Sequence, residues 1–96
     1  MNEQSYYMNI PAEVWDSNIT AKAMILYGHI SVLSNKKKYC YATNGYFEKV
    51  MKCSTSTITR CLKELEDIGI ITRQNIYTEG TRNIEMRKIF LNIGII

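Results

Sequence analysis

The stretch STSTITRCLKELEDIG, residues 54–69, decides the fold, because it holds a helix start, a two-sided helical pattern and a helix stop. Ser54 is a favourable N-cap residue, and Gly69 suits the left-handed conformation that ends many helices. The helix predicted between them runs from Thr55 to Ile68. At about 100° per residue, its apolar side chains share one face, which we expect to pack into a core. They are Ile58, Cys61, Leu62, Leu65 and Ile68.

The opposite face of this helix has hydroxyl and basic side chains in its first half. Ser54 to Thr57 are four hydroxyl residues in a row, although threonine is a mediocre helix former. Short hydroxyls approach bases and phosphates closely, and an arginine can donate two hydrogen bonds to a guanine edge. The acidic residues come late, where we expect them to point away from a duplex. The pattern favours a recognition helix in a DNA major groove over a plain solvated helix with a threonine-rich start.

The segments before residue 54 predict the rest of a helix-turn-helix unit. Thr43 can cap a helix over residues 44–51, and Lys52-Cys53 then makes a tight turn. Further upstream, Thr20 can cap a helix that ends near Ser34. Apolar residues recur in this segment at helical spacing, and further apolar residues widen that face. We therefore expect this helix to be the most buried one.

Shorter elements are expected towards both ends of the chain. Residues 6–10 predict a strand or extended arm, and Pro11 suits the first turn of a short helix that ends at Trp15. Residues 39–42 are β-prone enough for a brief strand. Residues 70–77 and 84–92 predict a β-hairpin, with a glycine in the turn between them.

Length and composition agree with this order of elements. A chain of 96 residues that is 46% hydrophobic suits one globular domain rather than disorder. We therefore predict an α+β winged helix-turn-helix over residues 1–96, with three core helices, a C-terminal β-hairpin wing and a short N-terminal strand and helix.

The net charge of +3 is unevenly distributed along the chain. Residues 1–34 hold three acidic residues against one lysine, a net of −2, which leaves +5 on residues 35–96. A basic half suits a polyanionic partner, although charge alone is equally compatible with an ordinary solvated surface.

Other classes of site have little support. Cys40, Cys53 and Cys61 are not at metal-ligand spacing, and the one histidine, His29, falls inside a predicted helix. We expect reduced, structural cysteines, no metal and no cofactor. The sequence has no nucleophile motif, phosphate-binding glycine loop or carboxylate pair on a shared face, so we expect neither enzyme activity nor a small-molecule substrate. No apolar run approaches the roughly 18 residues of a membrane span and no secretory signal is visible, which predicts a cytoplasmic protein without a membrane role.

The candidate DNA contacts come from the recognition helix, the helix before it and the hairpin. They are Ser54, Thr55, Ser56, Thr57, Thr59, Arg60, Lys63, Asn44, Lys49, Lys52, Arg73 and Arg82. Arg60 is the expected reader of a base edge, and Lys49 and Lys52 are expected at phosphates. Arg82 at the hairpin turn, with Arg73, Arg87 and Lys88 on the strands, can reach the backbone or the minor groove. Residues 36–38 are all lysine and can touch phosphates, but a run of like charges is more often a solvated loop.

The sequence also resembles a known family. The resemblance rests on IPAEVW (10–15), TAKAMILYG (20–28), YCYATN (39–44), STSTITRCLKEL (54–65) and GII (69–71). In these motifs the chain is similar to the helix-turn-helix domain at the N-termini of plasmid and phage replication initiators of Gram-positive bacteria. The resemblance implies binding to repeated sites in double-stranded DNA at a replication origin, often as a dimer. It also implies a separate C-terminal domain that recruits host replication machinery.

Several expectations follow from the resemblance and the chemistry together. Because that C-terminal domain is absent and residues 91–96 form an apolar end, we expect residues 1–96 to be the N-terminal part of a longer protein. The turn over residues 78–83 is outside the resemblance, so its DNA role rests on chemistry alone. The Tyr6-Tyr7 arm is a candidate homodimer contact through pairing of edge strands, with core packing of those tyrosines as the alternative.

Two other functions remain open at this point. A transcriptional regulator would use the same DNA-binding surface. A winged helix used for protein association would instead present Tyr6, Tyr7, Trp15 and the wing, and Arg60 would then be dispensable.

Overall fold

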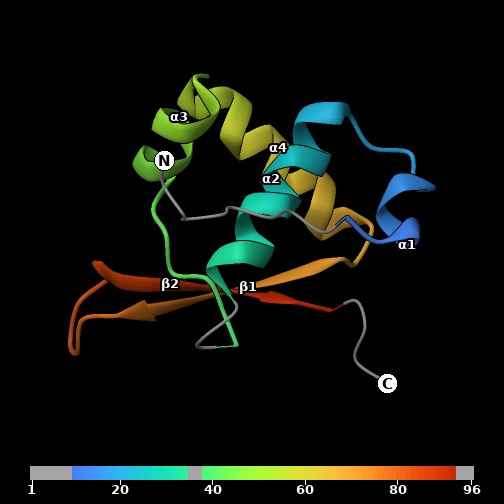
Figure 1. The fold of residues 1–96 in the computed structure, drawn as a ribbon. Helices are drawn as coiled ribbons and strands as arrows, with labels where there is room; N and C mark the ends of the chain where they lie inside the picture. The colour runs from blue at the N-terminus through green and yellow to red at the C-terminus, as the bar shows by residue number, and fades with distance from the viewer. Residues whose placement is uncertain (1–9, 35–37, 93–96) are drawn as a thin grey trace, which may run out of the picture.

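The helices lie on one side of a two-stranded hairpin (Figure 1). The structure is a computed structural model that describes residues 10–34 and 38–92. The elements are α1 (Ala12–Trp15), α2 (Ala21–Leu33), α3 (Asn44–Met51), α4 (Thr55–Asp67), β1 (Ile71–Tyr77) and β2 (Ile84–Leu91). This order confirms the predicted α+β winged helix-turn-helix. Of the expected N-terminal arm, only Ile10 falls within the described residues, where it packs against the core. The Tyr6-Tyr7 arm, Lys36, Lys37 and residues 93–96 lie outside them.

Hydroxyl side chains start the three longer helices, as predicted. The side chains of Thr20, Thr43 and Ser54 each accept a hydrogen bond from the backbone N–H three residues later, at 3.3, 3.2 and 3.3 Å. These bonds satisfy one of the N–H groups that the first turn of a helix leaves unpaired. At the other end of α4, Gly69 takes φ 80°, the left-handed stop expected there.

The core lies between α2, α3, α4 and the base of the hairpin. It includes the following fully buried side chains: Leu26, Ile30, Phe47, Ile58, Leu62, Leu65, Ile71 and Ile89. The predicted core face of α4 is confirmed except at its end, because Ile68 is 42% exposed. Ile68 is the C-cap residue, where the backbone leaves the helical path, so its side chain no longer follows the helical spacing.

The hairpin is attached to the helices near its base. β1 and β2 pair antiparallel from Ile71↔Leu91 onward, with a register irregularity near the turn. The brief strand predicted over residues 39–42 is reduced to one bridge, in which Cys40 and Ile89 exchange two backbone hydrogen bonds of 2.8 Å. The turn at the other end of the hairpin extends past the helices (Figure 1). No helix in the described part of the chain is long and apolar enough to cross a membrane.

Candidate nucleic-acid interface

The turn between α3 and α4 is fixed by backbone and side-chain contacts. Lys52 ends α3 in the left-handed conformation, at φ 55°, and the N–H of Cys53 donates to the carbonyl of Glu48 at 3.2 Å. The Glu48 carboxylate also accepts a hydrogen bond from the hydroxyl of Thr55 in the first turn of α4. Together with the burial of Phe47, these contacts hold α4 in a fixed position relative to α3.

The first half of α4 exposes most of the side chains that the sequence singled out. Ser54, Thr55, Ser56, Thr59, Arg60 and Lys63 are exposed, and Thr57 is half-buried. The Thr57 hydroxyl lies 3.1 Å from the hydroxyl of its cap, Ser54. Thr57 is therefore placed for capping, and the exposed hydroxyl and basic side chains that can meet a ligand are those of its neighbours.

Two sides of α4 can be separated by their tertiary contacts. Glu66 faces the hairpin, because it accepts a hydrogen bond of 2.6 Å from Arg73 on β1. Along a regular helix, Thr59 lies about 20° and Lys63 about 60° from the direction of Glu66, whereas Arg60 lies about 120° away. Thr59 and Lys63 thus share the side nearer the wing, and Arg60 lies towards α2.

Arg60 belongs to a network that joins α4 to the start of α2. Its Nε lies 3.4 Å from a carboxylate oxygen of Glu64, while its side chain stays 55% exposed. The same carboxylate accepts hydrogen bonds from the backbone N–H of Thr20 at 2.8 Å and from its hydroxyl at 3.0 Å. The predicted base reader is therefore oriented by a carboxylate that also caps α2, a link across 44 residues that no local pattern indicates.

Most of the hairpin cations that the sequence offered as DNA contacts are instead engaged within the domain. Arg73 is paired with Glu66, and Lys88 lies 4.6 Å from the ring centre of Tyr39. Arg87 is half-buried and donates to two residues just before and at the start of α3. Arg82 is exposed in the turn, so it is the hairpin cation best placed to reach a duplex.

The candidate DNA contacts outside α4 and the hairpin are also of two kinds. Some are exposed, and one is hydrogen-bonded within the domain. Lys49 and Lys52 are exposed, as a phosphate contact requires. Asn44 accepts a hydrogen bond of 2.8 Å from Arg87, so its side-chain oxygen is engaged within the domain. Lys38, the one lysine of the 36–38 run within the described residues, is exposed.

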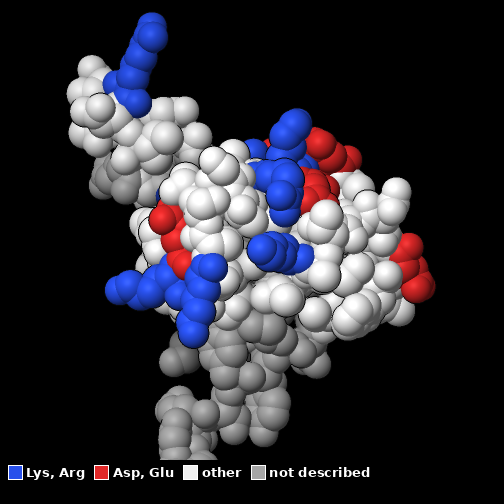
Figure 2. Space-filling model, turned by 90° about the horizontal axis from the view of Figure 1, so that it is seen from above, with Lys and Arg blue, Asp and Glu red and all other residues white. Residues whose placement is uncertain are grey.

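On the face of the molecule shown in Figure 2, the basic side chains lie in separate groups. Figure 2 shows several of them next to acidic side chains, in accord with the Arg60–Glu64 and Lys63–Asp67 pairs. Both pairs are of the i,i+4 type, and such surface pairs contribute only about 0.2–0.5 kcal/mol. Incoming phosphates can therefore replace these carboxylates at small cost.

The carboxylate of Glu64 makes stability depend on pH. Burial alone would raise the pKa of Glu64, but the N–H and hydroxyl of Thr20 and the guanidinium of Arg60 outweigh it, so the pKa lies below the ordinary value of 4.5. A group whose pKa is lowered by folding stabilises the folded state above its unfolded pKa. That contribution is lost as the pH falls from 4.5 through the lower folded-state pKa.

We therefore expect Glu64→Gln to flatten the acid side of the stability profile. The wild-type protein should lose more free energy of unfolding between about pH 6 and about pH 3 than the variant does. Urea unfolding at a series of pH values measures this difference. Glu13→Gln removes an exposed carboxylate from α1 and should keep the wild-type profile. An equal loss in Glu64→Gln and wild type would show that the Thr20–Glu64 contact does not stabilise the fold.

The three cysteines are free thiols, Cys40 and Cys61 buried and Cys53 partly so. Burial raises the pKa of both Cys40 and Cys61, which keeps these thiols protonated and unreactive at neutral pH. Within residues 10–34 and 38–92, no group of three or more His, Cys, Asp or Glu side chains is placed to hold a metal ion.

Comparison with known proteins agrees with this geometry. A family model described as a helix-turn-helix domain matches residues 17–71, which is more than half of the 96-residue chain. The chain belongs to this helix-turn-helix family. No curated protein and no solved structure matches it.

The matched segment of this helix-turn-helix domain begins just before α2 and ends at the first residue of β1. It therefore covers α3, the turn and α4, and leaves out the wing. A helix-turn-helix domain places its second helix in the major groove, and double-stranded DNA is the partner of this domain.

Proposed function

We propose that this helix-turn-helix domain binds repeated sites in double-stranded DNA at a replication origin and takes part in initiating plasmid or phage replication. The DNA-binding part rests on one observation: the first half of α4 exposes short hydroxyls, Arg60 and Lys63 on a helix held by the helix-turn-helix contacts. The replication part is supported by the sequence motifs shared with replication initiators. The domain acts by binding and needs no cofactor.

In the proposed complex the N-terminal half of α4 enters the major groove. Thr59 and Lys63 face the side nearer the wing, and Arg60 approaches from the α2 side. Arg82 at the hairpin turn reaches the neighbouring minor groove or its backbone. Lys49 and Lys52, on and just after α3, contact phosphates that flank the major groove.

The two basic side chains of α4 should contribute differently to recognition. We expect Arg60→Ala to cost about 1–3 kcal/mol of binding free energy and to relax specificity at one base pair, because an arginine can make two hydrogen bonds to guanine. Lys63→Ala should weaken binding to all sequences more evenly if Lys63 meets a phosphate, and should reduce the salt slope by about one.

Binding of each variant to a matched and a mismatched duplex, at several salt concentrations, separates these effects. Lys22→Ala, on α2, serves as a control that removes one exposed positive charge elsewhere. Unchanged affinity and unchanged specificity in Arg60→Ala would remove Arg60 from the base-reading role.

The proposed function is tested by selecting bound fragments from the replicon or genome that encodes the protein. Recovery of repeat-bearing fragments at a replication origin supports initiation. Recovery of promoter fragments instead supports the alternative, a transcriptional regulator that uses the same surface. Recovery of no specific fragment would contradict sequence-specific DNA binding altogether.

We also propose that the domain binds its sites as a homodimer. A single DNA-binding module buries only about 600–1,000 Å² of protein surface on DNA, and a dimer doubles that area and fixes the spacing of half-sites. Light scattering of the free protein and of its complex with a selected duplex gives the stoichiometry. A monomer in both samples would contradict the dimer.

A further inference from the structure

The hairpin has a second face, which points away from the helices (Figure 1). Ile71 of β1 and Ile89 of β2 are buried in the core, and neighbouring residues of a strand point to opposite faces of a sheet. Cys40 is also buried and bridges Ile89, so Tyr39 and Tyr41 on either side of it point outward. We call this surface the outer face of the wing. It consists of Tyr39, Tyr41, residues 72, 74 and 76 of β1 and residues 86, 88 and 90 of β2.

Three aromatic rings form a cluster on the outer face of the wing. The ring centre of Tyr39 lies 5.7 Å from that of Phe90 and 6.3 Å from that of Tyr41. Tyr39 and Phe90 are half-buried, whereas Tyr41 is 51% exposed. The cluster therefore presents the ring of Tyr41 to solvent, and the neighbouring rings support it.

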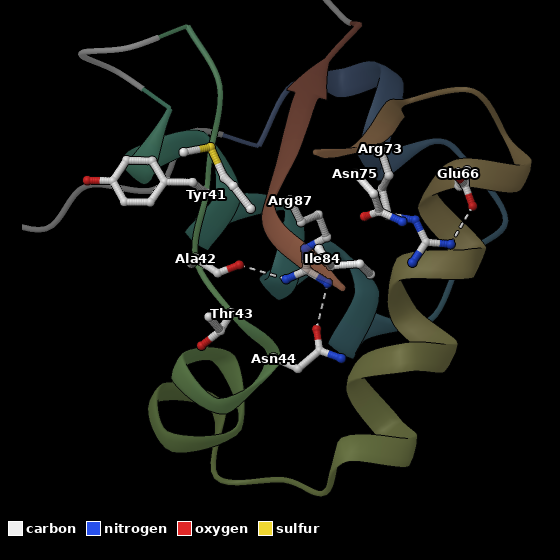
Figure 3. A pocket seen from close by; sticks show the side chains of 10 residues that line it. Tyr41, Ala42, Thr43, Asn44, Glu66, Arg73, Asn75, Ile84 and Arg87 are labelled. Carbon is white, nitrogen blue, oxygen red and sulfur yellow. Dashed lines mark hydrogen bonds and ion pairs between the residues drawn. The ribbon is translucent and has the colours of Figure 1, made fainter. Parts of the chain in front are cut away.

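The position of Tyr41 is fixed on both sides of the residue. Cys40 before it exchanges two backbone hydrogen bonds of 2.8 Å with Ile89. The carbonyl of Ala42 after it accepts a hydrogen bond of 2.7 Å from Nη2 of Arg87. Figure 3 shows this bond, and it shows the ring of Tyr41 directed away from it. A side chain held in this way loses little conformational freedom when a ligand packs against it.

The charged side chains of the outer face and of the segment beside it are all basic. Nζ of Lys88 lies 4.6 Å from the ring centre of Tyr39. Lys38, which is exposed, directly precedes Tyr39, and positions 36 and 37 of the sequence are also lysine. None of the residues assigned to the outer face is acidic. Two copies of this surface would repel each other, whereas a polyanion would be attracted to it.

Exposed rings beside lysines, without carboxylates, suit a single strand of nucleic acid. The bases of a single strand stack on aromatic side chains, and its phosphates lie near the cations. A duplex cannot use the rings in this way, because its bases already stack on one another inside the helix. The chemistry of the outer face therefore differs from that of α4, which presents hydroxyl and basic groups.

We propose that the outer face of the wing binds a stretch of single-stranded DNA, with Tyr41 as the ring on which a base stacks and Lys38 and Lys88 near the phosphates. This site is distinct from the proposed duplex interface, because it lies on the side of the hairpin away from the helices (Figure 1). The domain can therefore hold a duplex through α4 and a single strand through the wing at the same time. Such an arrangement serves where part of a duplex has been opened.

Binding of labelled oligothymidylate of about 12 nucleotides, a usual site size, tests this surface by fluorescence anisotropy. The comparison is an oligomer of the same length that lacks bases, which has the same charge and cannot stack. We expect the wild-type protein to bind oligothymidylate about 5- to 150-fold more tightly than the abasic oligomer, the range for one base stacked on an aromatic ring. Tyr41→Ala should lose this preference, and Tyr41→Trp should keep it.

Matched controls separate the outer face from the rest of the surface. Tyr77 is also 51% exposed but lies outside the outer face, so Tyr77→Ala should bind oligothymidylate as the wild type does. Lys88→Gln should lower the salt slope by about 0.7, the value for one phosphate contact on a single strand. Lys22→Gln, on α2, should leave that slope unchanged. Circular dichroism checks that each variant is folded.

Several results would overturn the proposal. Equal affinity of the wild-type protein for the two oligomers, or an equal loss in Tyr77→Ala, would show that no base stacks on Tyr41. Tighter binding of oligouridylate than of oligothymidylate would assign the surface to RNA. If Tyr41→Ala turns a dimer into a monomer and leaves oligothymidylate binding intact, the outer face joins two copies of the chain instead.

The same measurements distinguish this site from the proposed function. Arg60→Ala should weaken duplex binding and leave oligothymidylate binding unchanged. If no duplex binds while oligothymidylate binding depends on Tyr41, the proposed function fails and the single-strand site stands. If a duplex binds specifically and oligothymidylate does not bind, the single-strand site is wrong and the proposed function stands.

Discussion

We expect Phe47→Ala to lower the free energy of unfolding by about 3–5 kcal/mol, the usual cost of removing a fully buried aromatic ring. Phe47 has no exposed surface and is the buried residue of α3. Its ring joins α3 to the core that α2 and α4 share, so the cavity left behind would loosen the whole helix-turn-helix unit. Domains of this size have only about 5–15 kcal/mol of stability in total, so much of the variant should be unfolded under mild denaturing conditions.

Urea unfolding followed by circular dichroism measures this loss. Lys49→Ala, an exposed substitution on the same helix, serves as the control and should change the free energy by less than about 0.5 kcal/mol. Phe47→Leu, which refills most of the volume, should recover part of the loss. A loss below about 1 kcal/mol in Phe47→Ala would mean that α3 is not held by this ring.

The second large effect is expected from Thr59→Glu, which should abolish measurable binding to a selected duplex. Thr59 is exposed on the side of α4 nearer the wing, where the proposed complex brings it close to bases and phosphates. A carboxylate there would face the polyanion, and like charges placed together in an interface cost several kcal/mol. Because Thr59 packs against nothing in the core, the fold should be retained.

The control for Thr59→Glu adds the same charge at a distance. Ala12→Glu places a carboxylate in the exposed first turn of α1, where the helix dipole favours it. The two variants have the same net charge, so a difference between them in DNA affinity reports position. Wild-type affinity in Thr59→Glu would contradict docking through α4 and would favour the alternative in which exposed side chains such as Trp15, 59% accessible, bind a protein.

Features set by neighbouring residues were predictable from the sequence. Thr20, Thr43 and Ser54 start their helices because a hydroxyl at that position bonds an N–H only three residues away. The buried face of α4 follows from helical spacing for the same reason. Ile68 departs from it because the helix has already ended, and exact helix ends depend on how the chain leaves the last turn.

The arrangement of the candidate interface was less predictable, because it depends on contacts between distant residues. Arg60 is oriented through Glu64 by Thr20, and Arg87 is oriented by Asn44, 43 positions away. Composition identified both arginines as cations, but only the packing of α2 and α3 against α4 and the hairpin shows which of them is exposed. A count of basic residues therefore overstates the number that are free to meet DNA.

The attachment of the hairpin has a consequence for how such a domain can diversify. Cys40 holds β2 through Ile89, and Asn92 bonds to Gly69 beside the end of α4. At the other end, Tyr77 and Ile84 flank the turn and are 51% and 55% exposed. Insertions or deletions in the turn would therefore alter the reach of the wing without moving α4. One part of the molecule can thus vary in length while α4 is inherited intact.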